Sequence, residues 1–204
     1  MRLPPTLTRR QIFWGKALAW LLCLAPLARL VLLGLNGGLG ANPIEFITRS
    51  TGAWALVGLL ATLSFTPLRR LTGLTWLIRF RRLFGLFSFF YACLHFTTYI
   101  WLDQFFDLAG MASDIVKRPF IAIGLSAFVM LIPLAATSSQ RMMKKLGRNW
   151  RRLHSLTYLT ASLGVTHYWW LVKKDITQPL VYACVLAILL AMRLPACKPR
   201  KHRA

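Results

Sequence analysis

Long apolar runs separated by short basic connections dominate this sequence. Six runs are present, at residues 12–33, 52–66, 83–102, 119–136, 153–172 and 177–192. Each is close to the ~20 residues that a helix needs to cross a hydrocarbon layer of ~30 Å, although the second and the last are shorter. Because the runs are continuously apolar and do not alternate, membrane-spanning strands are disfavoured. The sequence therefore predicts an all-α integral membrane protein, a bundle of six transmembrane helices.

The composition excludes an ordinary soluble domain. Of the 204 residues, 56% are apolar and 15% are charged, which is too little charge for a soluble surface. The formal net charge is +21, and a strongly basic chain can indicate a nucleic-acid partner. Here the basic residues lie in clusters between apolar runs, so we expect membrane lipid and no nucleic acid as a partner. No internal repeat or soluble appendage is evident, and residues 1–204 are predicted to form one membrane domain.

The basic clusters predict the orientation, because Lys and Arg accumulate in cytoplasmic loops. With six spans, four clusters fall on one side: at the N-terminus, at 69–82, at 141–152 and in the tail from Arg193. Both termini are therefore predicted to be cytoplasmic. The opposite connections contain all five acidic residues: Glu45, Asp103, Asp107, Asp114 and Asp175. Turn-forming residues are expected to connect the spans at 36–43, 66–73, 117–119 and 175–179.

Three of the four histidines lie inside the apolar runs, where ionisable side chains are rare and usually functional. The third and fifth runs cross in the same direction, and His95 and His167 lie about 12 and about 14 residues from their cytoplasmic ends. At ~1.5 Å per residue the two imidazoles reach a similar depth, in the outer leaflet. His154 lies ~20 Å closer to the cytoplasm and is turned about 140° from His167 around the helix. The fourth histidine, His202, lies in the basic tail, where we expect it to be solvated.

Imidazoles at one depth on two helices are what a haem iron with two axial ligands requires. Two alternatives stay open: each histidine bonds to a backbone carbonyl or hydroxyl nearby, or the histidines form a proton relay in a transporter. The absence of acidic residues from the runs weakens the relay. The sequence thus predicts one bis-histidine site, at His95 and His167. A second haem at His154 would need another kind of ligand, because Arg81, Arg82 and Leu83 stand at the matching depth of the third run.

The four cysteines do not predict a disulfide framework. Cys23, Cys93 and Cys184 lie within the runs and Cys197 lies in the tail. The chain has no C-x-x-C-H motif, which excludes the usual covalent attachment of haem.

Several motifs resemble those of the MsrQ (YedZ) family. They include "NGGLGANPIEFITRSTG", "RFRRLFGLFSFFYACLHFTTY", "KRPFIAIG", "RRLHSLTYL" and "THYWWLVK", in order between about residue 34 and 193. This family comprises the haem-binding membrane subunits of bacterial periplasmic methionine sulfoxide reductase, and it belongs with the ferric-reductase-like transmembrane domains. The resemblance implies haem b and FMN as cofactors, with three span histidines that match His95, His154 and His167. No FMN motif can be assigned to particular residues.

The resemblance also implies a function and partners. The chain would be a non-catalytic electron-transfer subunit in the bacterial inner membrane. It would pass electrons from quinone or a cytoplasmic flavin reductase to the periplasmic molybdopterin enzyme MsrP, which reduces oxidised methionine in proteins. Two alternatives are a ferric or quinone-linked reductase core with another acceptor, and a non-redox membrane scaffold or transporter.

Charged residues on both sides suggest further contacts. Arg81, Arg82 and their cytoplasmic neighbours can pair with haem propionates, flavin phosphate or anionic lipid, although membrane topology alone also explains their placement. Asp103, Asp107 and Asp114 follow the third run on the predicted periplasmic side, where they could steer a soluble partner.

Overall fold

A computed structural model describes residues 7–172 and 175–193, and this part of the chain is helical, with no strand. The long helices are α1 (Arg9–Leu35), α2 (Pro43–Thr72), α3 (Arg81–Thr98), α5 (Pro119–Ala136), α7 (Arg148–Leu171) and α8 (Thr177–Ala191). The short elements are the 3₁₀ helix η1 (Thr75–Phe80), the π-helical turn η2 (Tyr99–Asp103), α4 (Leu108–Lys117) and α6 (Gln140–Leu146). The all-α prediction is confirmed for the described residues, and each predicted run overlaps one long helix.

Four helical segments are long and apolar enough to cross a membrane: α1, α2, the segment Thr75–Asp103 and α5. They make the chain a multi-pass membrane protein. Helix α7 has 24 residues but starts with a basic turn, and α8 has 15 residues, fewer than the ~20 of an upright span. That α7 and α8 also cross, and that both termini face the cytoplasm, stay predictions.

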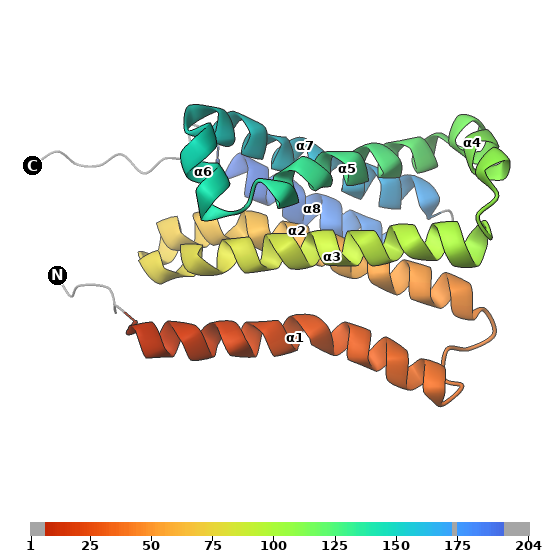
Figure 1. Cartoon of the computed structure of the whole chain (residues 1–204), viewed down its shortest axis with the longest axis horizontal. Helices are drawn as coiled ribbons and strands as arrows, with labels where there is room; N and C mark the ends of the chain where they lie inside the picture. Colours follow the sequence, from red (N-terminus) through yellow and green to blue (C-terminus); the bar gives the residue numbers. More distant parts are fainter. Residues whose placement is uncertain (1–6, 173–174, 194–204) are drawn as a thin grey trace, which may run out of the picture.

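The long helices run side by side along the long axis of the molecule (Figure 1). Helix α4 lies at one end of the bundle and α6 at the other, and these are called the α4 end and the α6 end below. Helix α1 begins and α8 finishes at the α6 end. The predicted features at Arg2, Lys173, Lys174, Cys197, His202 and the rest of the tail lie outside the described residues.

The core lies where α2, α3, α5, α7 and α8 meet. Its buried residues are Leu56, Leu59, Leu60, Leu63, Ala92, Leu131, Leu134, Ala161, Val165, Leu186 and Leu189. Helices α2 and α3 approach so closely that a Cβ on Gly58 would lie 3.1 Å from the Cα of Ser88. Small residues permit such contacts between helices in membranes. Helix α1 lies along one side of this bundle and exposes large apolar side chains such as Phe13 and Leu21, as a lipid-facing helix does (Figure 1).

A tyrosine hydroxyl repairs a break inside α1. Pro26 has no N–H group and its ring pushes on the preceding turn, so α1 bends near its middle (Figure 1). The buried Tyr91 hydroxyl of α3 enters the opened turn. It donates to the Cys23 carbonyl oxygen at 2.6 Å and accepts from the Leu27 N–H at 3.2 Å. The hydroxyl thus replaces one helical hydrogen bond and joins α1 to α3.

The predicted connection at 66–73 is wrong, because α2 continues through Pro67 to Thr72. Proline leaves the carbonyl four residues earlier without its helical donor, here that of Leu63. The Arg193 guanidinium donates to this oxygen at 2.6 Å, so the helix can continue. Helix α2 ends instead at Gly73, whose φ of 74° is the left-handed conformation that glycine favours at a helix end.

Helices α4 and α6 were not predicted, because each is too short to give an apolar run. Both begin at a capping side chain. Asp107 accepts hydrogen bonds from the N–H groups of Ala109 and Gly110, and Ser139 accepts one from Met142. The predicted break at 117–119 is confirmed, since α4 ends at Lys117 and α5 begins at Pro119.

Tyr91→Phe is expected to destabilise the protein by about 1–2 kcal/mol, because the Cys23 carbonyl and the Leu27 N–H lose their shared partner in a non-aqueous setting. Thermal unfolding in detergent measures the change. Tyr182→Phe is the matched control, since Tyr182 is half-buried and its hydroxyl has no hydrogen bond among the described residues. Equal unfolding temperatures for the two variants would contradict the bridging role.

Candidate functional site

His95 of α3 and His167 of α7 lie next to each other inside the bundle. Their ring centroids are 6.2 Å apart and the ring planes meet at 75°. Helices α3 and α7 therefore bring together the two imidazoles that the sequence places at a similar depth. His154 is not part of this group.

Each imidazole is held by a backbone carbonyl of a neighbouring helix. His95 Nδ1 lies 2.9 Å from the Thr48 oxygen of α2, and His167 Nδ1 lies 2.7 Å from the Phe120 oxygen of α5. A carbonyl oxygen accepts and never donates, so in both rings Nδ1 carries the proton. Nε2 then keeps its lone pair, and it makes no hydrogen bond to the described residues in either ring. Metal-bound histidines show this arrangement, with one nitrogen fixed by an acceptor and the other free to coordinate.

A glycine makes room for each imidazole. A Cβ on Gly52 would lie 3.0 Å from His95 Nδ1, and a Cβ on Gly124 would lie 2.7 Å from His167 Nδ1. Each glycine is four residues after the carbonyl that holds the ring, on the same face of the helix. The missing side chain lets the ring approach the helix closely and reach that oxygen.

The two halves of this site repeat the same pattern. The first half consists of Thr48, Gly52 and His95, and the second of Phe120, Gly124 and His167. Each residue of the second half lies 72 positions after its counterpart in the first. Two completely buried hydroxyl residues, Ser88 and Thr160, have the same spacing. The sequence analysis found no internal repeat, because the residues around these positions differ. The recurring interval between glycine and histidine was the signal that could have revealed it.

A cavity of about 620 Å³ opens between α2, α3, α5 and α7 and includes both imidazoles. Its volume is in the range of sites that hold a small molecule. Near the rings the walls are mainly apolar, with Leu56, Phe96 and Phe128 among them. Toward the α4 end the lining becomes polar: Asn42, Glu45, Arg49, Tyr99, Asp103 and Arg118. The cavity therefore suits a largely apolar ligand with a polar edge.

Tyr99 contributes an unsatisfied polar atom to this cavity. Its hydroxyl is buried and has no hydrogen-bond partner among the described residues. Tyr99 begins the π-helical turn η2, an irregularity that is common at functional sites. A buried hydroxyl without a partner is costly, so it points to a missing acceptor in the cavity. Sequence analysis did not identify Tyr99, Gly52 or Gly124.

The imidazole pair fits a metal that brings further ligands of its own. Two imidazoles on opposite sides of one metal have ring centres about 6 Å apart, given metal–nitrogen bonds of about 2 Å. The observed separation is 6.2 Å. Among the described residues, no group of three or more His, Cys, Asp or Glu side chains could hold a bare ion. Iron in a porphyrin already has four nitrogen ligands and needs two more, which suits this pair.

His154 lies at the α6 end of α7, in a different environment. Its ring stacks on Trp150, with centroids 4.0 Å apart. The Thr137 hydroxyl donates to the Pro133 oxygen, so His154 Nε2 donates to that hydroxyl at 3.1 Å. This hydrogen bond is of the kind that the sequence left open as an alternative for His154. A second haem at His154 stays a prediction.

Comparison with known proteins identifies the class of this fold and site. Residues 51–165, more than half of the chain, match the family described as the ferric reductase like transmembrane component. No solved structure matches the chain.

Curated relatives narrow the class. The chain is 54% identical over 182 residues to a protein of Herminiimonas arsenicoxydans, covering 88% of this chain and 84% of that protein. It is 51% identical to one of Ralstonia nicotianae (94% and 90% covered) and 49% identical to one of Bordetella pertussis (97% of each). All three are named protein-methionine-sulfoxide reductase heme-binding subunit MsrQ. The chain therefore belongs to the MsrQ family.

Gly124→Ala is expected to destabilise the protein by about 1–3 kcal/mol, because its Cβ would overlap the His167 ring and overpack the site. Gly85→Ala is the control, since there a Cβ would lie 3.6 Å from Thr62, an ordinary contact. The better helix propensity of alanine should stabilise that variant by up to about 1 kcal/mol. Thermal unfolding compares the two, and shifts of the same sign would contradict the close approach.

Proposed function

We propose that this chain is the haem-binding, electron-transfer subunit of a protein-methionine-sulfoxide reductase system. The observation that carries the proposal is the pair of imidazoles 6.2 Å apart, each fixed through Nδ1. The names of the relatives, which describe heme-binding subunits of that reductase, support the same conclusion. His95 and His167 are the proposed axial ligands. No catalytic residue is assigned to this chain, because sulfoxide reduction would take place on the partner.

The surrounding residues would prepare the two ligands. The carbonyls of Thr48 and Phe120 fix the imidazole tautomer and orientation, and they raise the basicity of Nε2. Haem b would supply one-electron exchange at its iron. With both histidines holding the iron, the site would suit electron transfer and would leave no ligand position for a substrate. Apolar walls such as Leu56 and Phe128 would exclude water.

The polar edge of the cavity would receive the carboxylates of the haem. The Tyr99 hydroxyl lacks an acceptor, and a propionate oxygen would provide one. Arg49 and Arg118 also line this edge and could add charge-assisted hydrogen bonds. Each arginine already has an acidic neighbour, with Glu45 at 2.7 Å from Arg49 and Asp114 at 3.4 Å from Arg118. Tyr99 is therefore the residue whose bonding most needs the ligand.

The proposed direction of transfer follows from the charge distribution. The basic α6 end would face the cytoplasm, with six spans and both termini on that side, and the α4 end would face the periplasm. Electrons from quinone or a cytoplasmic flavin reductase would leave through the His95 and His167 site to periplasmic MsrP. The membrane would be the bacterial inner membrane. FMN belongs to this proposal through family resemblance, without assigned residues.

A ferric or quinone-linked reductase core with another acceptor is the second candidate, favoured by the family match over residues 51–165. The same histidines would serve it. Mixing the reduced protein with an MsrP-type reductase and its sulfoxide substrate, or with a ferric chelate, separates the two candidates by which one reoxidises the protein.

His95→Ala and His167→Ala should each remove the haem of this site, because one imidazole and one carbonyl anchor disappear in each variant. Haem per chain and the low-spin reduced-minus-oxidised spectrum measure the loss. His154→Ala is the matched control in α7 and should keep the low-spin signal of the pair. Any haem that the His154→Ala variant loses would be a second haem, bound near His154. Wild-type haem content in both of the first two variants would show that the assignment is wrong.

The acidic residues near α4, which are proposed to steer a soluble partner, also have structural roles. These roles limit the substitutions that can test the steering. Asp107 caps α4, and Asp114 accepts from Gln104 at 3.0 Å and pairs with Arg118. Replacement by alanine would therefore disturb α4 as well as the surface charge. Asparagine removes the charge and still caps a helix.

The triple variant Asp103→Asn, Asp107→Asn, Asp114→Asn is expected to slow haem reoxidation by the periplasmic reductase about tenfold at low salt, because steering by charge is lost. Rates across a salt series, with the haem spectrum as a check, measure the effect. The double variant Glu45→Gln, Asp175→Asn removes acidic charge at the same end but outside α4. A wild-type rate that does not respond to salt would exclude docking by charge.

A further inference from the structure

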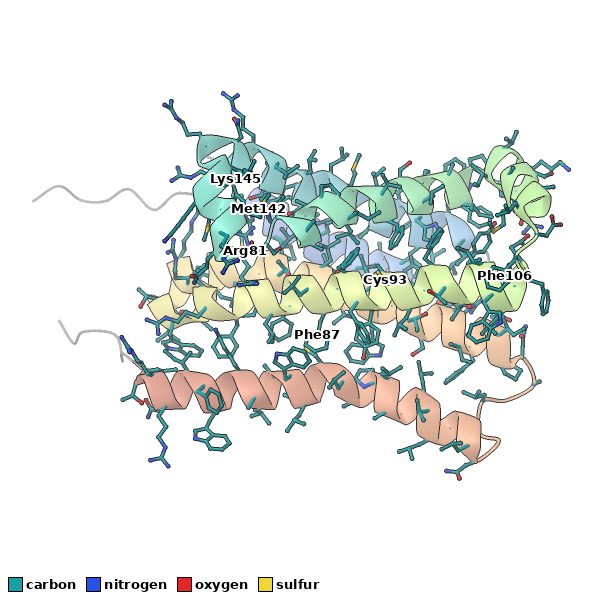
Figure 2. The ribbon with its side chains drawn as sticks, viewed as in Figure 1. Arg81, Phe87, Cys93, Phe106, Met142 and Lys145 are labelled. Carbon is teal, nitrogen blue, oxygen red and sulfur yellow. The ribbon has the colours of Figure 1, made fainter. Side chains whose placement is uncertain are left out.

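Two arginines that have no acidic partner among the described residues lie at the α6 end, far from the imidazole pair. Arg81 is the first residue of α3, and Arg193 follows the end of α8. Both side chains are half-buried and lie within electrostatic range of each other. Figure 2 shows Arg81 at the same end of the molecule as Met142 and Lys145 of α6. All five Asp and Glu residues of the chain lie at the start of α2, in η2, at or in α4, or between α7 and α8. These segments are at the α4 end of the bundle (Figure 1).

The Arg193 guanidinium is fixed but incompletely bonded. It donates through Nη1 to the Tyr158 hydroxyl and through Nη2 to the Leu63 carbonyl, and it lies 4.9 Å from the centre of the Tyr158 ring. Its Nε is buried and has no partner among the described residues. A guanidinium has five N–H donors in a rigid plane. The contacts to α2 and α7 use two of them, so donors remain for a ligand.

Arg81 has no hydrogen bond or ion pair to any described residue, although it is half-buried. The adjacent Arg82 is exposed, as a residue that only marks the cytoplasmic side would be. Two like charges that are partly removed from water cost energy unless an anion compensates them. The protein supplies no carboxylate side chain at this end.

Tyr158 completes a set of donors around the two arginines. Its hydroxyl accepts from Arg193, so its own proton is available to an acceptor. Two guanidinium groups and a phenol hydroxyl match an anion with several oxygens. Arginine binds phosphate groups in this way, and basic pockets between helices on the cytoplasmic side of membrane proteins bind anionic headgroups.

We propose that Arg81, Arg193 and Tyr158 form a binding site for a phosphate group at the α6 end. The phosphate would belong to an anionic phospholipid or to a soluble phosphate compound. The site is separate from the haem pocket and does not depend on the proposed electron transfer.

Two titrations of the haem-loaded, full-length protein test the proposal. One compares thermal unfolding in phosphatidylcholine nanodiscs that contain increasing amounts of phosphatidylglycerol. The other adds inorganic phosphate to protein in uncharged detergent, at constant ionic strength. Saturable stabilisation by phosphatidylglycerol alone would identify a lipid site, and stabilisation by phosphate as well would identify a site open to soluble compounds.

Arg81→Gln is the decisive variant, because Arg81 bonds to no described residue and its loss should not disturb folding. We expect at least about tenfold weaker apparent binding than for the wild type. The neighbouring Arg82→Gln removes the same charge from an exposed position and should bind like the wild type. Arg193→Lys keeps the charge and the donor to Leu63 but loses the planar fork, so it should also bind more weakly. No saturable effect in either titration, or equal losses in Arg81→Gln and Arg82→Gln, would overturn the proposal.

Discussion

The hydrogen bond from a histidine Nδ1 to a backbone carbonyl of the neighbouring helix is the interaction on which the site depends. It occurs at His95 and at His167, at 2.9 and 2.7 Å. In a membrane an imidazole without a partner is costly, so the bond satisfies one nitrogen and at the same time determines which nitrogen is left for a metal. The glycine four residues after each carbonyl is a condition of this bond, because a Cβ there would occupy the position of the ring.

The same requirement, that polar groups be satisfied inside the protein, explains how the helices tolerate prolines. Pro26 and Pro67 each disrupt a helical hydrogen bond where water is scarce. Tyr91 of α3 satisfies the first helix, and Arg193, which follows the end of α8, satisfies the second. The repairs therefore also join helices that are distant in sequence. Arg193 shows how such a repair can position a group for a second role, since its contacts to Tyr158 and Leu63 use two of its five N–H donors.

The sequence predicts the helices and the imidazole pair because both follow from regular geometry. Apolar runs locate the spans, and a rise of ~1.5 Å per residue places His95 and His167 at one depth. The carbonyl partners, the two glycines, Tyr99 and the hydroxyl bound to His154 could not be predicted in this way. They depend on which helices are neighbours and how each is rotated, and a single apolar run contains no information on either. The end of α2 was misplaced for the same reason, since the distant Arg193 satisfies the carbonyl that Pro67 leaves without a helical donor.

The 72-residue correspondence between the two halves accounts for the symmetry of the imidazole site. It does not extend to matching residues at the α6 end. α2 with α3, and α5 with α7, each supply one carbonyl, one glycine and one histidine. At the α6 end, counting the same 72 positions pairs Arg82 with His154, so the repeat brings no second pair of imidazoles there. In the matched part of the bundle, two like histidines line one cavity. At the α6 end the same count pairs unlike residues, so the arginines and the histidine there can have different roles.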